Sequence, residues 1–115
     1  MFDGIIHAKK NDHLCFGAML GNTNDAFVAL MGMDLPKERR SVTYIAPAYD
    51  AGTEINDESC ATLPDPACSG EELSPDDEGE GFVTIHNGIN GIGGLDVAAY
   101  DWLNPVAKIV IEQVR

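Results

Sequence analysis

The chain has 115 residues, of which 44% are hydrophobic, and this is enough for one globular domain with a modest core. Its formal net charge of -12 and isoelectric point near 4.3 argue against a nucleic-acid-binding protein, because such a surface repels phosphate backbones. No apolar run approaches the ~20 residues that span a bilayer, and residues 1–10 lack the basic and apolar segments of a signal peptide.

Short apolar segments separated by turn residues predict strands in the first half of the chain. A short apolar piece at 5–8 precedes a polar turn at 9–13. Apolar runs then occupy residues 14–20 and 26–33. Residues 41–46 have the β-branched and aromatic composition that is typical of a strand.

The second half begins with a long irregular region, residues 50–81, which is rich in acids, prolines and glycines. A loop of this length in a compact domain is usually functional or disordered. Residues 82–86 are predicted to form a strand, and residues 87–94 form a turn-rich segment with two Asn-Gly pairs. Residues 98–103 suit a short helical turn, and residues 106–114 alternate like a final strand.

These patterns predict an all-β fold for the whole chain. No segment shows a helical period longer than two turns, and the short strands with turn signals between them favour an antiparallel β-sandwich. We therefore expect a single domain over residues 1–115, with a long acidic loop.

The acidic loop holds the most informative chemistry, in the run Y-D-A-G-T-E-I-N-D-E. Asp50 and Glu54 are followed closely by two further acids, Asp57 and Glu58. Carboxylates this close repel one another unless a cation lies between them, and Ca²⁺ takes oxygen ligands from flexible loops. Gly52 permits a sharp turn that would bring Asp50 and Glu54 together. The alternative is a solvated acidic turn.

The three cysteines are predicted to have different roles. Cys60 and Cys68 flank a short loop that contains two prolines, and a local disulfide between them would indicate an oxidising compartment. Two unpaired thiols are the alternative. Cys15 lies in an apolar run, so we predict that it packs in the core as a small hydrophobe.

Three blocks of sequence resemble one known family when they are taken together. They are A-M-L-G-N-T-N-D-A-F-V at 18–28, Y-D-A-G-T-E at 49–54 and D-W-L-N-P-V-A-K-I at 101–109. The segment 81–89, which ends in H-N-G-I, is similar to the bacterial members. Their order and spacing resemble the later part of the spondin domain, a module of F-spondin, mindin and bacterial secreted proteins.

The resemblance implies a β-sandwich that binds calcium near one end and acts in extracellular adhesion or recognition. Asp25 and Asp50 align with the family's acidic positions around the ion, and Glu54 fills the last place of the D-A-G-T-[DE] signature. From the residues alone, Asp25 could instead be a turn or capping aspartate. The N-terminal strands of a spondin domain have no counterpart in this chain, so the alternatives are a short variant, a fragment, or a chain that pairs with another chain supplying the strands. In the last case an open sheet edge would accept the partner strand.

Other residues with reactive or aromatic side chains form no catalytic motif. His7, His13 and His86 are far apart in sequence and lack motif spacing. Trp102 is expected to be a core anchor, and the functional alternative is an exposed ring that stacks on a sugar.

The sequence therefore predicts a secreted or periplasmic, calcium-binding recognition or adhesion module that is not an enzyme. Its expected ligand is an extracellular protein or a glycan. The alternative function is a structural subunit that identical chains complete by strand exchange at an open sheet edge. A third hypothesis is a hydrolase with Asp25 and Asp50 as an acid–base pair.

Overall fold

Antiparallel strands dominate the computed structural model, which describes every residue except 2, 64–67, 69–78 and 115. The elements are β1 (His13–Met19), β2 (Ala26–Asp34), β3 (Ser41–Ala46), β4 (Tyr49–Asp50), β5 (Thr84–Ile85), the short helix α1 (Val97–Tyr100) and β6 (Ala107–Glu112). The prediction of an all-β chain with antiparallel sheets is confirmed. Within the described residues, no helix has the length and apolar character needed to cross a membrane.

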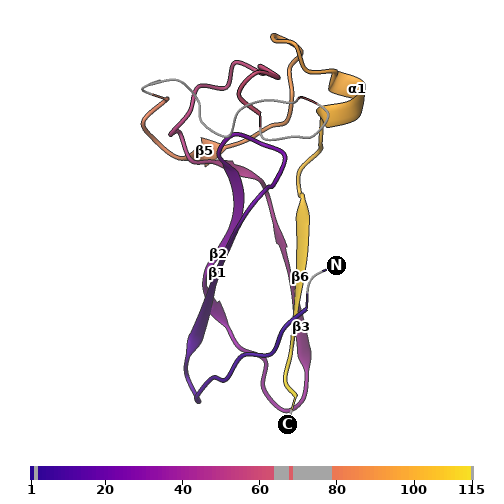
Figure 1. Ribbon diagram of the computed structural model, residues 1–115. Coiled ribbons are helices and arrows are strands. Elements are labelled where there is room, and N and C mark those ends of the chain that lie inside the picture. Colours follow the sequence, from indigo (N-terminus) through magenta and orange to yellow (C-terminus); the bar gives the residue numbers. More distant parts are fainter. Residues whose placement is uncertain (2, 64–67, 69–78, 115) are drawn as a thin grey trace.

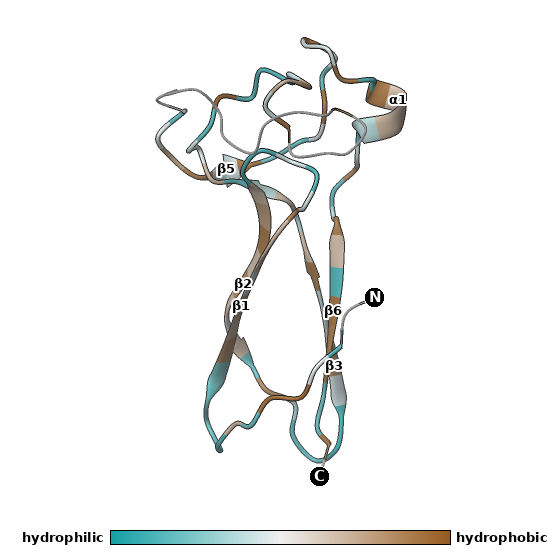
Figure 2. Cartoon of the chain, in the orientation of Figure 1, coloured by the Kyte–Doolittle hydropathy of each residue, from teal (hydrophilic) through white to brown (hydrophobic). Residues whose placement is uncertain are grey.

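Two sheets form the body of the molecule. One has the strand order β1-β2-β4-β5, and the other pairs β3 with β6. Strand β2 buries Ala26, Val28 and Leu30, which alternate with less buried residues. This period of two places one face of the sheet inward. Figure 2 shows apolar residues along the strands and hydrophilic residues at the turns that join them.

Strand β1 pairs with β2 around a bulge. Leu14 is opposite Met33 while Phe16 is opposite Leu30, so β2 carries one extra residue. Gly32 lies in the bulge with a φ of 65°, a conformation that glycine adopts without a steric cost. Its N–H donates to the Sγ of Cys15 at 3.4 Å. Cys15 is exposed on this edge strand, so the prediction that it packs in the core is wrong.

The β3–β6 ladder runs along the other side of the molecule and is paired from Ser41 with Glu112 to Ala46 with Ala107. The two sheets converge beneath the loops at one end, which we call the loop end (Figure 1). The principal extents are 50 × 28 × 21 Å and the radius of gyration is 16.9 Å, against about 13 Å for a compact domain of this length. The closed sandwich itself stays a prediction.

The strand predictions are accurate where the hydrophobic alternation is long. Residues 41–46 form β3 as predicted, and the runs at 14–20 and 26–33 form β1 and β2 with ends shifted by one residue. Residues 82–86 retain only the two-residue strand β5, while the apolar piece at 5–8 forms no strand. Part of the predicted acidic loop, at 64–67 and 69–78, lies outside the described residues.

Candidate functional site

Four segments that are distant in sequence meet at the loop end (Figure 1). They are the β1–β2 turn, the chain after β4, the turn-rich segment after β5, and the residues around α1. The side chain of Asn104, which follows α1, binds the residue before β4 and the residue after β5. Its Oδ1 accepts from the Ala48 N–H at 2.8 Å, and its Nδ2 donates to the His86 carbonyl at 2.9 Å. Side-chain hydrogen bonds of this kind fix the loops on the sheets.

Asp25 connects the β1–β2 turn to the chain after β4. Its Oδ2 accepts from the backbone N–H of Thr53 at 2.7 Å, from the Thr53 hydroxyl at 2.8 Å and from the Glu54 N–H at 3.1 Å. The residue is only 4% exposed. Its other carboxylate oxygen, Oδ1, is buried and has no hydrogen-bond partner within the described residues. A buried carboxylate oxygen without a partner is energetically unfavourable and calls for a physical explanation.

Asp50 holds the turn that follows its own strand. One carboxylate oxygen accepts from the Gly52 N–H at 2.7 Å, and the other accepts from the Asn56 amide. Gly52 has a φ of 69°, and its carbonyl accepts from the Gly81 N–H at 2.8 Å. The predicted sharp turn at Gly52 is present, and it brings residue 81 against residue 52.

The three carboxylates predicted to bind calcium do not form one group. Asp25 and Asp50 sit on neighbouring strand ends, because Ala26 pairs with Asp50, and the Glu54 N–H contacts the Asp25 carboxylate. Within the described ranges, no cluster of three or more His, Cys, Asp or Glu side chains is arranged to hold a metal ion. The calcium site therefore stays a prediction, and the unpartnered Oδ1 of Asp25 is the feature that favours it.

Glu58 connects the acidic loop to the turn-rich segment. Its carboxylate accepts from the Asn90 N–H at 2.5 Å and from the Ile92 N–H at 2.8 Å. Burial of this carboxyl raises its pKa, but the backbone N–H groups of residues 90–93 lower it by more, so the pKa lies below its usual value. Glu58 thus binds the loop as a carboxylate. From the sequence, Glu58 was predicted only as a further acid near an ion.

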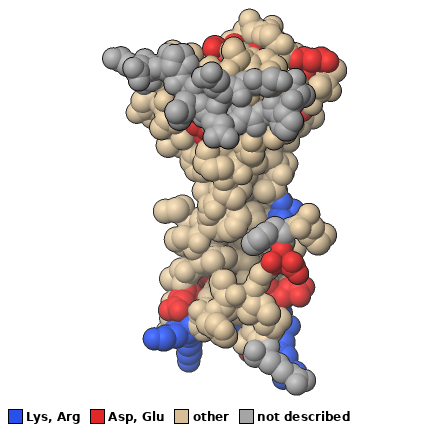
Figure 3. Space-filling model, viewed as in Figure 1, with Lys and Arg blue, Asp and Glu red and all other residues tan. Residues whose placement is uncertain are grey.

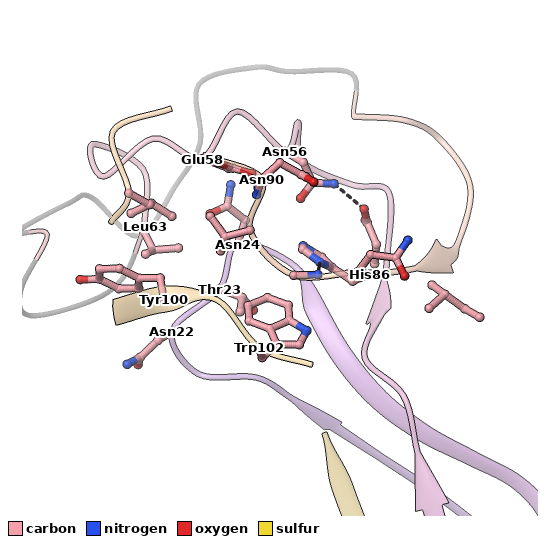
Figure 4. A pocket seen from close by; sticks show the side chains of 16 residues that line it. Asn22, Thr23, Asn24, Asn56, Glu58, Leu63, His86, Asn90, Tyr100 and Trp102 are labelled. Atoms are coloured by element: carbon pink, nitrogen blue, oxygen red, sulfur yellow. Dashed lines mark hydrogen bonds between the residues drawn. The ribbon is translucent and has the colours of Figure 1, made fainter. Parts of the chain in front are cut away.

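A cavity of about 220 Å³ opens between these segments. Figure 4 shows the amide side chains of Asn24, Asn56 and Asn90 grouped on one side, with the rings of Tyr100 and Trp102 on the other. Asp50 and Glu58 also line it. We call this space the loop-end cavity. It combines an amide-rich wall with an aromatic wall.

The aromatic wall is built from Trp102 and its neighbours. The rings of His86 and Trp102 lie 4.7 Å apart between centroids and are tilted by 43°. The Nδ1 of His86 accepts from the Gly88 N–H at 3.1 Å, which places the proton of the neutral ring on Nε2. Trp102 also lines a second cavity of about 500 Å³ with Leu20 and Val106, so it borders both spaces.

The electrostatic field at the loop end is negative. No Lys or Arg occurs between Ser41 and Ala107 in the sequence. On the face that Figure 3 shows, Lys and Arg side chains lie only on the lower half of the molecule, away from the loop end. Among the described residues lining the loop-end cavity, none is Lys or Arg. An anionic ligand would find no cationic partner there.

The predicted disulfide is present next to this site. Cys60 and Cys68 are joined, with their Cα atoms 4.9 Å apart. The Cys68 sulfur lies 3.6 Å from the hydroxyl of Tyr100, one of the residues that line the loop-end cavity.

Three asparagines that connect the loops were not predicted from the sequence. Asn56, Asn90 and Asn104 lie in turn-rich segments where asparagine is expected for local reasons. Their long-range partners, such as Asp50 for Asn56 and Ala48 for Asn104, have no sequence signal. The sequence feature that comes nearest to predicting these contacts is the two Asn-Gly pairs, because such pairs mark turns whose backbone N–H groups are available for hydrogen bonds.

Comparisons with known proteins add no family assignment. No protein-family model, no curated protein and no solved structure matches this chain.

Proposed function

We propose that this chain is an extracellular recognition module that binds its ligand in the loop-end cavity without catalysing a reaction. The observation that carries the proposal is the composition of the cavity wall, with several amides and aromatic rings and with carboxylates that already hold the loops. Sites of this kind, largely pre-formed and lined by aromatic and uncharged polar groups, are typical of small-ligand binding. A carboxylate that accepts two backbone N–H bonds is poorly suited to proton transfer.

The spondin-like blocks support this proposal because they lie together at the loop end. The block at 18–28 contributes Asp25, which binds Thr53 and Glu54 of the block at 49–54. The block at 101–109 contributes Trp102 to the cavity. The Cys60–Cys68 disulfide supports a secreted or periplasmic location, since such bonds persist in oxidising compartments.

The test is to map small-molecule binding by amide chemical shifts, using a chemically mixed fragment library. We expect shifts that cluster at Asn24, Asn90 and Trp102, because these residues line the cavity. Hits that cluster elsewhere, for example on β3 and β6, would contradict the assignment of the site. Enzymatic turnover of any fragment that binds would contradict its non-catalytic character.

Calcium is a further element of the proposal, and Asp25 is the residue that supports it. A cation near Asp25 would give the unpartnered Oδ1 a ligand. Ligand binding to the native state raises stability by ~2.7 kcal/mol at a hundred times the dissociation constant. We therefore expect calcium at that concentration to raise the melting temperature by about 10–20 °C, since each ~1 kcal/mol corresponds to ~4–8 °C in small domains. Thermal melts with calcium and with chelator measure this.

Two variants test whether the ion binds where proposed. Asp25→Asn and Asp50→Ala are expected to abolish the calcium-dependent rise, whereas Glu112→Gln, an exposed position on β6, should keep it. An unchanged melting temperature in the wild type with and without calcium would remove the ion from the proposal. The acidic run would then stabilise the loops through its hydrogen bonds, without a bound ion.

A second candidate function is a structural subunit that pairs with another copy of this chain. Apolar side chains on the strands remain exposed, with Met31 at 74%, Ile45 at 65% and Val110 at 49%. Met31 borders an apolar groove of about 500 Å³ that Phe27 and Tyr49 also line. Strands with open edges can pair with a second copy.

Sedimentation velocity should then show a concentration-dependent dimer. Met31→Glu is expected to disrupt this dimer, and Lys10→Glu is expected to leave it intact. A monomer at high concentration with full amide protection would exclude the structural-subunit function.

A further inference from the structure

We propose that the loop-end cavity binds one uncharged sugar residue of a glycan chain, an inference that rests on the proposed function. The cavity presents three properties that together select such a ligand: side-chain amides with spare hydrogen-bonding capacity, flat aromatic surface, and no Lys or Arg among the described residues that line it.

The amide wall has hydrogen-bonding capacity to spare. The Asn24 Nδ2 makes only a long bond of 3.5 Å to the Ile55 carbonyl. The Asn90 backbone N–H binds Glu58, but its side-chain amide makes no hydrogen bond within the part of the chain that the structure describes. An amide has both a carbonyl acceptor and N–H donors. Neighbouring sugar hydroxyls, which both donate and accept, are matched by such groups.

The aromatic wall supplies the complementary apolar surface. A pyranose ring has one face rich in C–H groups, and an indole or phenol ring offers a flat apolar surface with a polar edge. Trp102 and Tyr100 both line the cavity, and His86 packs against Trp102 at 4.7 Å, which holds the indole in place. Figure 4 shows these rings facing the same space as the amide side chains.

The charges of the residues that line the cavity disfavour ionic ligands. An acidic sugar or a phosphate would meet Asp50 and Glu58 with no Lys or Arg in the described lining. An ammonium ligand would need carboxylate oxygens directed at it, but both carboxylates already accept N–H bonds that hold the loops, from Gly52 and Asn56 and from Asn90 and Ile92. An uncharged, hydroxyl-rich ligand fits both conditions.

The size of the site indicates one sugar unit with room for a neighbour. The loop-end cavity, at about 220 Å³, is below the ~300–1,000 Å³ of sites for drug-sized ligands. The second cavity shares four lining residues with the first, namely Asn22, Thr23, Tyr100 and Trp102. A glycan chain could therefore continue past the indole from one space into the other.

Trp102 also provides the measurement, because it is the only tryptophan in the chain. We would titrate the wild-type protein with cellobiose, maltose, lactose and N,N′-diacetylchitobiose and follow tryptophan emission. A uronate-containing disaccharide and tetramethylammonium serve as the anionic and cationic probes. The paired variants are Asn24→Ala/Asn90→Ala, which removes the amide wall, and Asn11→Gly, an asparagine with φ of 73° in the turn before β1. Thermal melts confirm that both variants fold.

A saturable emission change with at least one neutral disaccharide is the expected result. The double alanine variant should weaken it by about tenfold, as expected for two lost hydrogen bonds, and Asn11→Gly should leave it unchanged. The proposal is overturned if no neutral probe changes the emission, or if the double variant binds as well as the wild type. A response to the uronate or to tetramethylammonium alone also overturns it. If the sugar proposal fails but fragments still shift the amides that line the cavity, the proposed recognition module is retained.

Discussion

Gly52→Ala is expected to lower the free energy of unfolding by roughly 3–5 kcal/mol. Gly52 has a φ of 69°, where a residue with a Cβ loses about 1–2 kcal/mol. A Cβ at this position would lie 2.4 Å from the carbonyl oxygen of Phe82 and 2.8 Å from its nitrogen. Backbone atoms cannot move aside as a flexible side chain can, so the contact between residues 52 and 82 must open. Urea unfolding of the variant and the wild type measures the change.

Two other glycines separate the causes of this effect. Gly32 has a φ of 65° but open space around its Cβ position, so Gly32→Ala should show only the conformational cost of about 1–2 kcal/mol. Gly21 has neither a positive φ nor a close neighbour, so Gly21→Ala should be nearly neutral. If Gly52→Ala costs no more than Gly32→Ala, the close approach of residues 52 and 82 does not exist in solution.

The effect of Gly52 on the site is indirect. The Gly52 N–H binds the Asp50 carboxylate, and the Gly52 carbonyl accepts from the Gly81 N–H. Opening this turn would free Asp50, which borders the loop-end cavity. We therefore expect ligand binding to weaken together with stability in Gly52→Ala.

The strands could be predicted where burial alternates along the chain. Strand β2 buries Ala26, Val28 and Leu30, and β3 alternates in the same way, so the hydrophobic pattern of the sequence directly reflects which face is inside. The disulfide between Cys60 and Cys68 was also predictable, because the spacing of the two residues is local. These features depend on neighbours within about ten positions in the sequence.

The features that the sequence did not predict depend on distant partners. Strand β4 has two residues, too few for a pattern, and it is defined by its pairing with β2 and β5. Cys15 belongs to an apolar run but lies on an edge strand, where no further strand of the described chain covers it. An apolar run predicts a strand, but it does not predict whether that strand lies at the edge or in the centre of a sheet.

The acidic run shows how one pattern permits two physical explanations. The sequence interpretation placed a cation between the carboxylates because like charges repel. In the structure, Asp25, Asp50 and Glu58 each accept hydrogen bonds from backbone N–H groups of loops. Bonds to a carboxylate are stronger than neutral ones, so N–H dipoles can offset the repulsion that a cation would otherwise neutralise. The proposed calcium ion would have its clearest role at the Asp25 Oδ1, which is buried and has no hydrogen-bond partner among the described residues.

Glu58→Ala is expected to lower the free energy of unfolding by about 3–5 kcal/mol, because it removes two hydrogen bonds to a buried carboxylate and leaves their donors without partners. The donors are the N–H groups of Asn90 and Ile92, at 2.5 and 2.8 Å. The amide shifts of residues 89–94 should move toward those of a disordered segment. The exposed Glu112→Ala on β6 serves as the control and should change stability little.

The same carboxylate should make stability depend on pH in a defined direction. The pKa of Glu58 is lowered in the folded protein by backbone N–H groups that outweigh the effect of burial. A lowered folded pKa contributes stability that is present above the unfolded value of ~4.3 and is lost as pH falls through the folded value. The stability gap between the wild type and Glu58→Gln should therefore be widest near neutral pH and should narrow below about pH 4. A gap that stays constant from neutral pH to pH 2 would mean that the ionised form of Glu58 is not what holds the turn-rich segment in place.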